Sequence, residues 1–460
     1  MKKLMTIATV ALLMSSCGIY NKYERPDDVK TTGLVRDINS LTDTLAVSDT
    51  TSFGNLPWRS VFTDPQLQTL IEQGLNNNVD LLNAALNVKM VEAQLHAARL
   101  AFLPQLTIGA QGTAVSWDHQ KATQTYSFPL AASWNLDLFG NLLNQKRSAQ
   151  MSLLATKDYQ TVVQTNIICG IANMYYTLLM LDRQLEILDG MEELTKNTWE
   201  LMKLQKELGR YRETSVQSAY SSYLSVKAQK EDMKRQIRET ENSLSLLLGQ
   251  PAQQIQRSKL DEQSLPEEFS TGVGLQLLSN RADVHAAEMQ LAACFYDVQT
   301  ARSRFYPSIT ISGTGAYTNS SGMGIVNPGK ILANAVASLA QPIFMRGQLT
   351  AGLRVAKAQQ EQAYNTWQNT IFKAGNEVSN ALVLYNSSNE KARIEAEQVK
   401  VLTKNVEDTK ALMSQSTSTY LEVIQAQSAL LNAQISKVSD DFYKMQAVVN
   451  LYQALGGGRK

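Results

Sequence analysis

The chain is poor in cysteine, histidine and charge. Its three histidines follow no metal-ligand spacing: His96, His119 and His285. Charged residues make up 18%, below the roughly 25% typical of soluble domains, and the formal net charge of +1 argues against nucleic acid as the main partner. With no phosphate-binding glycine loop and no nucleophile elbow, the sequence predicts no enzyme, cofactor or metal. Cys169 and Cys294 lie in mostly apolar helical stretches, so we interpret them as small buried residues, with a disulfide as the alternative.

Proline is absent from two long stretches. None occurs from Asn141 to Leu208 or from Gln348 to Gln415, and roughly 68 residues of unbroken helix would be about 100 Å long. Within both stretches apolar residues step by threes and fours, as in a coiled-coil seam: Ile167, Ile171, Met174, Leu178, Leu181, Leu185 and Leu188, then Val399, Leu402, Val406, Thr409 and Met413. Apolar residues off the seam, such as Ile168 and Leu179, indicate that the helix has partners on more than one face.

The N-terminus has no apolar run long enough to span a bilayer as a helix. Two lysines precede the apolar residues 4–13, and Met14-Ser15-Ser16-Cys17 follows. This resembles the lipobox of bacterial lipoproteins, in which signal peptidase cuts before a cysteine that is then diacylated. We predict a signal peptide over residues 1–16, lipidation of Cys17 and a lipid-anchored leader over residues 17–63. An ordinary secretory signal that happens to contain a cysteine is the alternative.

One segment occurs twice. Ala97 to Gly112 reads AARLAFLPQLTIGAQG, and Thr300 to Gly315 reads TARSRFYPSITISGTG. In each copy apolar residues recur at helical spacing before the proline and alternate after it, which predicts a helix that leads into a strand. The likeness extends to NLLNQKRSA against QLTAGLRVA and to SLLLGQ against YQALGG. We therefore predict two repeats, over residues 64–250 and 271–456, that pack as one pseudo-symmetric unit.

Helices and strands can be placed within these repeats. Asp64 caps a helix that begins at Pro65, and a second helix is predicted over residues 79–103. Four amphipathic stretches have the length of membrane strands: residues 106–117, 126–139, 309–319 and 331–344, with the loop NSSGMGIVNPGK between the last two. An aromatic girdle is predicted from Trp117, Tyr126, Trp134 and Tyr317. A soluble sandwich is the alternative; in a membrane, four strands cannot close a barrel, whereas three chains would supply twelve.

With these parts the chain resembles the lipoprotein branch of the TolC/NodT family of outer membrane efflux proteins. The resemblance covers essentially the whole mature chain. It rests on Cys17, on WRSVFTDPQLQTLIEQGLNNNVDLLNAA, on the two helix-proline-strand copies, on DLFG and QPIFMRGQL, and on YLEVIQAQSALLNAQ. It implies a mainly α fold with a membrane β-barrel part: a trimer whose twelve-stranded barrel, four strands per chain, is continuous with a long α-helical barrel. It also implies an outer membrane exit duct of a tripartite efflux pump, which passes small molecules from an inner-membrane transporter and a periplasmic adaptor to the exterior.

The turns LGRYRET (208–214) and SQSTSTY (414–420) are expected to form helical tips distal from the strands. The resemblance implies adaptor contacts there, for which the candidates are Gly209, Arg210, Tyr211, Ser416 and Thr417. Family members often carry an acidic residue where this chain has Ser418, so an aspartate gate is not expected. The candidates for a constriction are Leu412, Met413, Ser418 and Tyr420. Solvated helix turns are the alternative for each tip residue.

Two other functions remain open at this point. An exit duct for protein secretion would share the architecture and differ in its partner. A lipid-tethered coiled-coil protein would explain Cys17 and the apolar seams, although it would not need four amphipathic strands. The transported substrate is not determined by the sequence.

Overall fold

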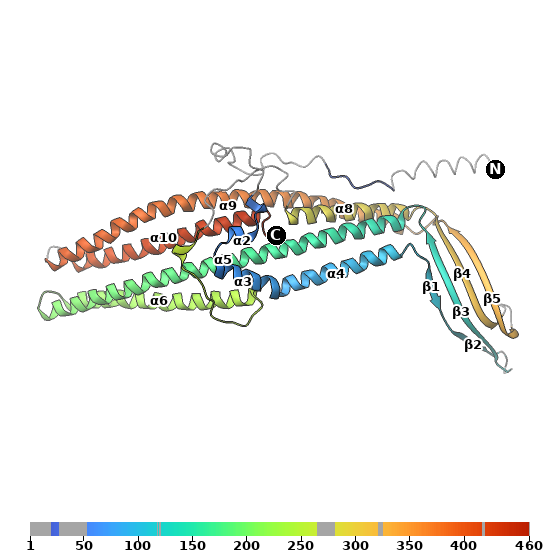
Figure 1. Ribbon diagram of the computed structural model, residues 1–460, viewed down its shortest axis with the longest axis horizontal. Helices are drawn as coiled ribbons and strands as arrows, with labels where there is room; N and C mark the ends of the chain where they lie inside the picture. The colour runs from blue at the N-terminus through green and yellow to red at the C-terminus, as the bar shows by residue number, and fades with distance from the viewer. Residues whose placement is uncertain are drawn as a thin grey trace. The chain divides into compact units, whose positions relative to one another are not determined.

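The computed structural model describes residues 20–26, 53–116, 118, 121–264, 281–320, 325–415 and 419–459 (Figure 1). Its helices recur in the two halves of the chain with equal lengths. α4 (Val79–Leu100) and α8 (Ala282–Ser303) have 22 residues each, α5 (Asn141–Glu207) and α9 (Gln348–Ser414) have 67, and α6 (Glu213–Leu247) and α10 (Tyr420–Ala454) have 35. Adding 203 to a residue number in α4 gives the corresponding position in α8. Adding 207 relates α5 to α9 and α6 to α10 in the same way.

The proline-free stretches are helical over nearly their full length, as predicted. α4 ends three residues before the predicted position 103, because residues 101–103 form a turn in front of Pro104. The shorter elements are η3 (Phe53–Asn55), α2 (Trp58–Val61), α3 (Pro65–Asn77) and η4 (Leu260–Glu262). Within the described ranges, no helix combines the length and apolar character that a membrane span requires.

Local chemistry determines where these helices begin and end. Asp64 caps α3 as predicted, since its side chain accepts a hydrogen bond from the Gln66 N–H at 2.8 Å and proline fills the first helical position. α10 begins with a capping box between Thr419 and Glu422. α6 and α10 both end in left-handed glycines, Gly249 (φ 68°) and Gly456 (φ 79°), each with the paired backbone bonds of a Schellman turn.

The strands form one antiparallel sheet (Figure 1). β3 (Thr123–Leu136) pairs with β4 (Ser308–Ser320), which pairs with β5 (Ile325–Ala340); β1 (Gln105–Ile108) and β2 (Gln111–Val115) both lie along the other edge of β3. The prediction of one strand over residues 106–117 was therefore incomplete. β1 and β2 keep a single register along β3, and the break lies opposite Pro129, which accepts a bond from the Gly109 N–H at 3.0 Å but has no N–H to return.

Two further strand predictions were wrong at their ends. The loop predicted over residues 319–330 is much shorter, because β4 extends to Ser320 and β5 starts at Ile325. β5 is paired on one side only, and proline is tolerated in such an edge strand. β3 stops at Leu136 and β5 at Ala340, short of the predicted 139 and 344. After β3 the Asp137 carboxylate accepts a bond from the Leu143 N–H at 2.7 Å, so DLFG is the turn into α5.

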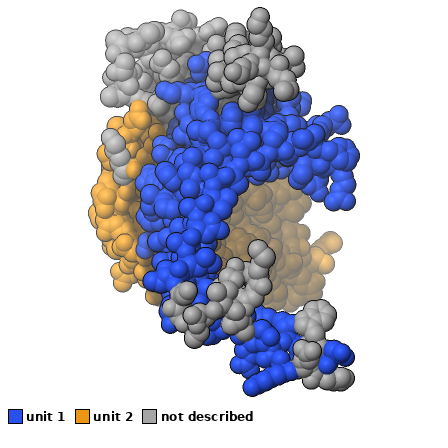
Figure 2. Space-filling model, turned by 90° about the vertical axis from the view of Figure 1, so that its right-hand side faces the viewer, with its two compact units in different colours: residues 1–30, 86–158, 285–369 blue, residues 31–85, 159–284, 370–460 orange. Residues whose placement is uncertain are grey.

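The chain divides into two compact units, each assembled from segments distant in sequence (Figure 2). Unit 1 comprises residues 1–30, 86–158 and 285–369, and unit 2 comprises residues 31–85, 159–284 and 370–460. Each unit thus takes corresponding parts from both halves of the sequence.

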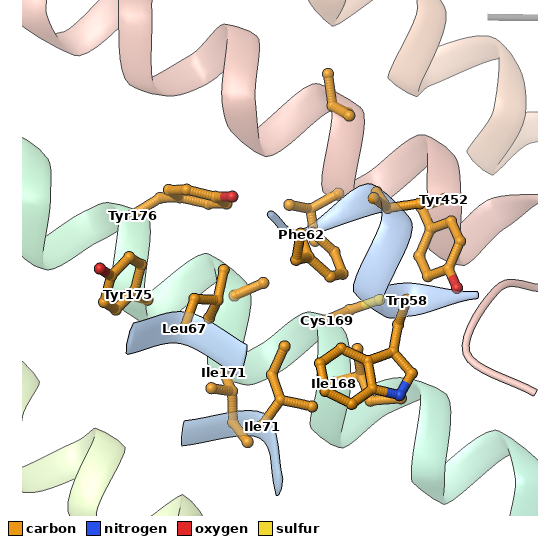
Figure 3. Close-up of a cluster of buried hydrophobic side chains, with 14 of the residues drawn as sticks. Trp58, Phe62, Leu67, Ile71, Ile168, Cys169, Ile171, Tyr175, Tyr176 and Tyr452 are labelled. Atoms are coloured by element: carbon orange, nitrogen blue, oxygen red, sulfur yellow. The ribbon is translucent and has the colours of Figure 1, made fainter. Parts of the chain in front are cut away.

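Unit 2 has its main hydrophobic core around the middle of α5 (Figure 3). Seam residues such as Ile171 and off-seam residues such as Ile168 and Leu179 are all buried there, which confirms that this helix is covered on more than one face. α2, α3 and α10 supply the covering side chains, including Trp58, Phe62, Leu67, Ile71 and Tyr452. Both remaining cysteines are free thiols; Cys169 is buried, and burial raises the pKa of its thiol to about 12, whereas Cys294 is half-buried.

Candidate functional site

The sheet of unit 1 has one apolar face and one mainly polar face. Cross-strand partners share a face, so the register assigns each side chain to its side. The apolar face carries Leu106, Ile108, Phe128, Leu130, Ala132, Trp134, Leu136, Ile309, Ile311, Tyr317, Ile331 and Leu339. The opposite face carries Thr107, Ser127, Ser133, Asn135, Thr310, Ser312, Thr314, Thr318, Asn334 and Ser338, together with a few small or apolar residues. This division is typical of strands between lipid and water.

The apolar face is uncovered in the single chain. Ile108 and Ile331 are each 84% exposed, and Leu339 is 67% exposed. A soluble sheet packs one face against a core, and large exposed apolar patches mark a partner or a membrane. The sheet therefore has its apolar surface available to lipid.

Aromatic rings gather at one end of this face. Tyr126 lies 6.4 Å from Tyr317 and 6.3 Å from Phe128, measured between ring centroids. Of the four residues predicted for a girdle, the structure thus brings Tyr126 and Tyr317 together. Trp134 lies further along β3 and donates its Nε1–H to the Phe102 carbonyl at 2.9 Å, while Trp117 falls outside the described residues. Phe128 was not predicted for the girdle, although it alternates with Tyr126 along β3 and therefore shares its face.

The two helical turns of unit 2 meet in one cluster. The rings of Tyr211, before α6, and Tyr420, at the start of α10, make an edge contact with centroids 6.1 Å apart. They pack against a buried group from all four long helical segments: Met202, Val216, Ala219, Met413 and Val423. We call these seven residues the tip cluster. Residues predicted for two different roles, adaptor contact and constriction, therefore share one hydrophobic contact.

The constriction candidates differ in accessibility. Met413 is 7% exposed because it lies within the tip cluster, whereas its neighbour Leu412 is 46% exposed. Tyr420 is partly buried. Ser418 lies outside the described residues, as do Cys17, Ser416 and Thr417.

The first turn presents its backbone and charges to solvent. Gly209 is left-handed (φ 75°), and a Cβ added there would meet no atom within 4 Å. Arg210 is exposed and its guanidinium lies 3.4 Å from the Gln205 amide oxygen. Lys206 and Glu213 form an ion pair across the turn. The turn is thus open enough to be contacted from outside.

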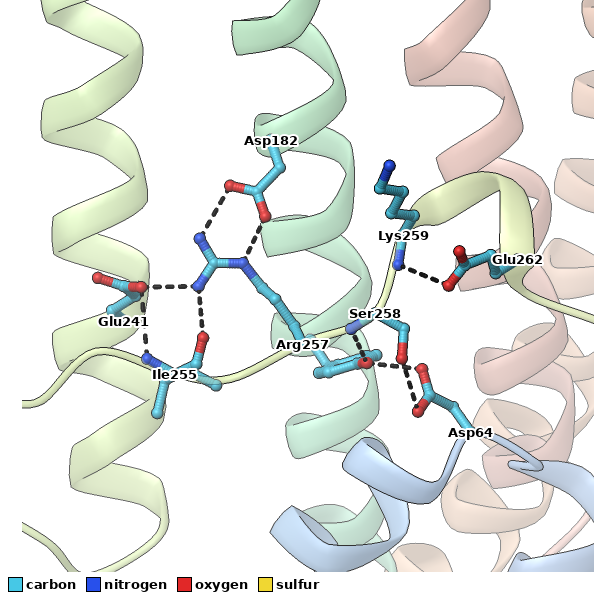
Figure 4. Close-up of polar contacts among 9 residues, drawn as sticks. Asp64, Asp182, Glu241, Ile255, Arg257, Ser258, Lys259 and Glu262 are labelled. Carbon is cyan, nitrogen blue, oxygen red and sulfur yellow. Dashed lines mark hydrogen bonds and ion pairs between the residues drawn. The ribbon is translucent and has the colours of Figure 1, made fainter.

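A polar network holds the segment around residues 255–259, which follows α6 (Figure 4). The sequence did not predict this network. Arg257 binds both oxygens of Asp182 on α5 and, at 2.6 Å, Glu241 on α6. Burial alone would lower the pKa of Arg257, but the two carboxylates raise it above its ordinary value. No local signal marks this network, since Arg257 and Asp182 are 75 positions apart.

Asp64 extends the same segment's contacts. The Tyr175 hydroxyl donates to Asp64 at 2.6 Å, and the Ser258 hydroxyl donates to it at 3.1 Å. Burial acts to raise the pKa of Asp64, but the hydrogen bonds from Tyr175, Gln263 and the Gln66 N–H outweigh it and lower that pKa. Asp64, the predicted cap of α3, therefore also binds the segment that follows α6.

The sequence model of one family, described as outer membrane efflux protein, matches residues 70–250 and 274–457. The chain belongs to this family. Its function is accordingly that of an efflux channel in the outer membrane. The uncovered apolar face of the sheet fits that location.

Individual members of the outer membrane efflux protein family resemble the chain over nearly its full length. The cation efflux system protein CusC of Escherichia coli (strain K12) is 27% identical, with 98% of each chain covered. The probable outer membrane lipoprotein SilC of Salmonella typhimurium is 26% identical, covering 99% of this chain and 98% of its own. The pyoverdine export outer membrane protein OpmQ of Pseudomonas aeruginosa is 30% identical, covering 87% of both.

A crystal structure of CusC has the same fold. It superposes with a TM-score of 0.84 at 25% identity and covers 95% of this chain and 99% of its own. That structure was determined in a study of transmembrane channel formation by CusC. The mainly helical, TolC-like fold is thereby shown for this chain.

Proposed function

We propose that the chain is the outer membrane exit duct of a tripartite efflux pump and works as a homotrimer. The observation that carries this proposal is the sheet with one lipid-type face and one polar face. Its β1/β2 and β5 edges pair with nothing else among the described residues, and open strand edges do not occur within a bilayer. Three copies would pair these edges into a closed barrel of twelve strands whose polar faces line the lumen.

The lipid anchor and the two repeats belong to the same proposal. Lipidation of Cys17, after removal of residues 1–16, would tether the mature chain to the outer membrane ahead of the leader 17–63. The equal helix lengths support two repeats over residues 64–250 and 271–456. In the trimer, the three copies of each repeat would supply six long helices, and the two sets of six would alternate around one duct.

The tips are the proposed meeting place with the periplasmic adaptor. Gly209, Arg210 and Tyr211 of the first turn, with Ser416 and Thr417 of the second, are the proposed contacts. The exposed backbone around Gly209 and the tip cluster that joins Tyr211 to Tyr420 support this placement. The inner-membrane transporter would contact the adaptor and deliver the cargo.

We propose that the inner-membrane transporter, not the duct, selects the cargo. CusC is named for cations and OpmQ for pyoverdine, yet both align with most of this chain. One duct architecture therefore suits chemically different small molecules. We propose small-molecule efflux as the function and protein secretion as the alternative that adaptor identification would test.

Electron microscopy of the mature protein in mild detergent, with the mass measured on the same sample, tests the proposal. We expect a hollow trimeric tube with a short detergent-covered barrel and a helical tunnel of about 100 Å. A monomer without a detergent belt, or a solid rod, would contradict it and favour the lipid-tethered coiled coil. Purifying the chain with its adaptor and identifying the inner-membrane protein that accompanies them would separate efflux from secretion.

A further inference from the structure

Two carboxyl groups lie together in unit 2, away from the tips. Asp440 on α10 is 2% exposed, and its Oδ1 accepts a hydrogen bond from Lys391 Nζ at 2.7 Å. Its other oxygen, Oδ2, and Oε2 of Glu395 on α9 are shielded from solvent and receive no hydrogen bond from the described residues. Glu395 follows Lys391 by one helical turn on α9, so it lies on the side of the helix from which Lys391 reaches Asp440. Shielded oxygens without a donor are costly, and a proton on one of the two carboxyls would supply a donor for the other.

The first half of the chain shows that this position does not need a polar pair. At the shift of 207 residues that relates the two helical hairpins, Glu395 corresponds to Leu188 and Asp440 to Met233. Leu188 and Met233 pack in one hydrophobic cluster, to which α10 also contributes Leu431. The same fold position is therefore filled by apolar contact in one hairpin and by two ionisable groups in the other. A purely structural requirement does not explain the carboxyl pair.

We propose that Glu395 and Asp440 share one proton, carried on Glu395 Oε2 and donated to Asp440 Oδ2, and that this proton makes the α9–α10 contact sensitive to pH. Lys391 is bound to the other oxygen of Asp440, so Oδ2 is the oxygen that is left to accept this hydrogen bond. The protonated Glu395 supplies the missing donor. Both buried oxygens are then satisfied.

The charges around Glu395 support this assignment. Burial raises the pKa of the Glu395 carboxyl above its ordinary value of 4.5, and the Asp440 carboxyl and the charge of Asp441 add to the rise, whereas Lys391 opposes it. Asp441 is itself paired with Lys437 at 2.7 Å. The neighbouring helix α5 contributes an uncharged contact, from the Gln184 amide to Ser439. Among the groups that shift the pKa of Glu395, the two aspartates outnumber the one lysine, and the net direction is upward.

The direction of the pH effect follows from this raised pKa. The folded hairpin holds the proton more tightly than the unfolded chain, so the contact is strongest below pH 4.5 and weakens as pH rises through the raised value. Above it, the two neighbouring carboxylates repel each other. One linked proton changes the opening equilibrium by up to about tenfold per pH unit. The hairpin α9–α10 would thus tighten as its surroundings become acidic.

Hydrogen exchange of the full-length protein tests the proposal across pH, after correction for intrinsic amide exchange. Segments 391–399 and 436–444 should lose protection as pH rises, while the corresponding segments 184–192 and 229–237 should not. In Glu395→Gln the amide donates at every pH, so the dependence should vanish. Glu390→Gln, a change of an exposed glutamate on the same helix, should leave it intact. Equal profiles in both hairpins, or an unchanged profile in Glu395→Gln, would overturn the proposal.

A second measurement does not depend on how the variants fold. In an infrared pH titration, the carbonyl band of one protonated carboxylic acid should persist in the wild-type protein to a higher pH than the bands of ordinary carboxyls. The band should disappear in the variant Glu395→Leu with Asp440→Met, which installs the pair of the first hairpin and should keep the fold. Absence of the band in the wild type would refute the shared proton. Neither result depends on the proposed trimer, because the pair lies within one chain.

Discussion

Removal of the Arg257 side chain should release the segment that follows α6. In Arg257→Ala, Glu241 would keep only a long contact with the Ile255 N–H at 3.4 Å, although its side chain is 5% exposed. Asp182 is 37% exposed, so water can solvate it after the change and its share of the loss is small. The cost is therefore dominated by one buried carboxylate left without its cation.

Loss of one partner from a buried ion pair typically costs 3–5 kcal/mol, and we expect about 3 kcal/mol here because Glu241 retains one donor. This corresponds to more than about a hundredfold increase in local opening. Hydrogen exchange of residues 251–258 reports that opening directly. Global denaturation would be less informative, because local and global unfolding need not coincide in a large assembly.

A double-mutant cycle identifies the cause. If the buried charge of Glu241 produces the loss, Glu241→Gln in the Arg257→Ala background should recover more than half of it, with a coupling of about 1.5–3 kcal/mol. A cost below about 1 kcal/mol for Arg257→Ala, or an equal cost in both backgrounds, would refute the reasoning. Arg235→Ala, which removes an exposed arginine of α6, is the control and should change protection little.

Three further predictions concern the turns, the sheet and the duct. Gly249→Ala should destabilise by about 1–3 kcal/mol more than Gly209→Ala in thermal unfolding. Both glycines are left-handed, but only at Gly249 would the added Cβ lie 2.5 Å from the carbonyl oxygen of Asn77 in α3; equal costs would contradict this. Leu130→Lys on the apolar face should lose about 2–4 kcal/mol of membrane stability, whereas Ala131→Lys on the opposite face should lose little, as folding titrations into vesicles would measure. Leu412→Ser should raise closed-state conductance in planar bilayers, and unchanged leakage would remove this residue from the constriction.

Much of the fold could be predicted because its signals are local. Helix length followed from the absence of proline in α5 and α9, and the start of α3 followed from the Asp64-Pro65 cap. The change of apolar period at Pro104 and Pro307 marked the entry into strands. Strand ends were predicted less well, since pairing with a neighbouring strand extended β4 and β5 into a stretch that is rich in turn residues.

The candidate site could be predicted only in part. Tyr211 and Tyr420 were each singled out from a turn, but their contact depends on packing between segments 209 positions apart in sequence. The burial of Met413 beside the exposed Leu412 depends on which side of α9 faces the tip cluster. A heptad pattern identifies the apolar positions of a helix but not which other helix packs against them.

The sequence by itself determined the duplication, the kinds of element and their order, because periodicity, proline placement and capping act over a few residues. Only the tertiary structure decided which charges meet. Arg257 joins Asp182 to Glu241, and Lys391 binds Asp440, because long helices bring distant positions side by side. In a buried site the energy of a charge depends on its neighbours in space. That information is absent from residue spacing and present in the packed helices.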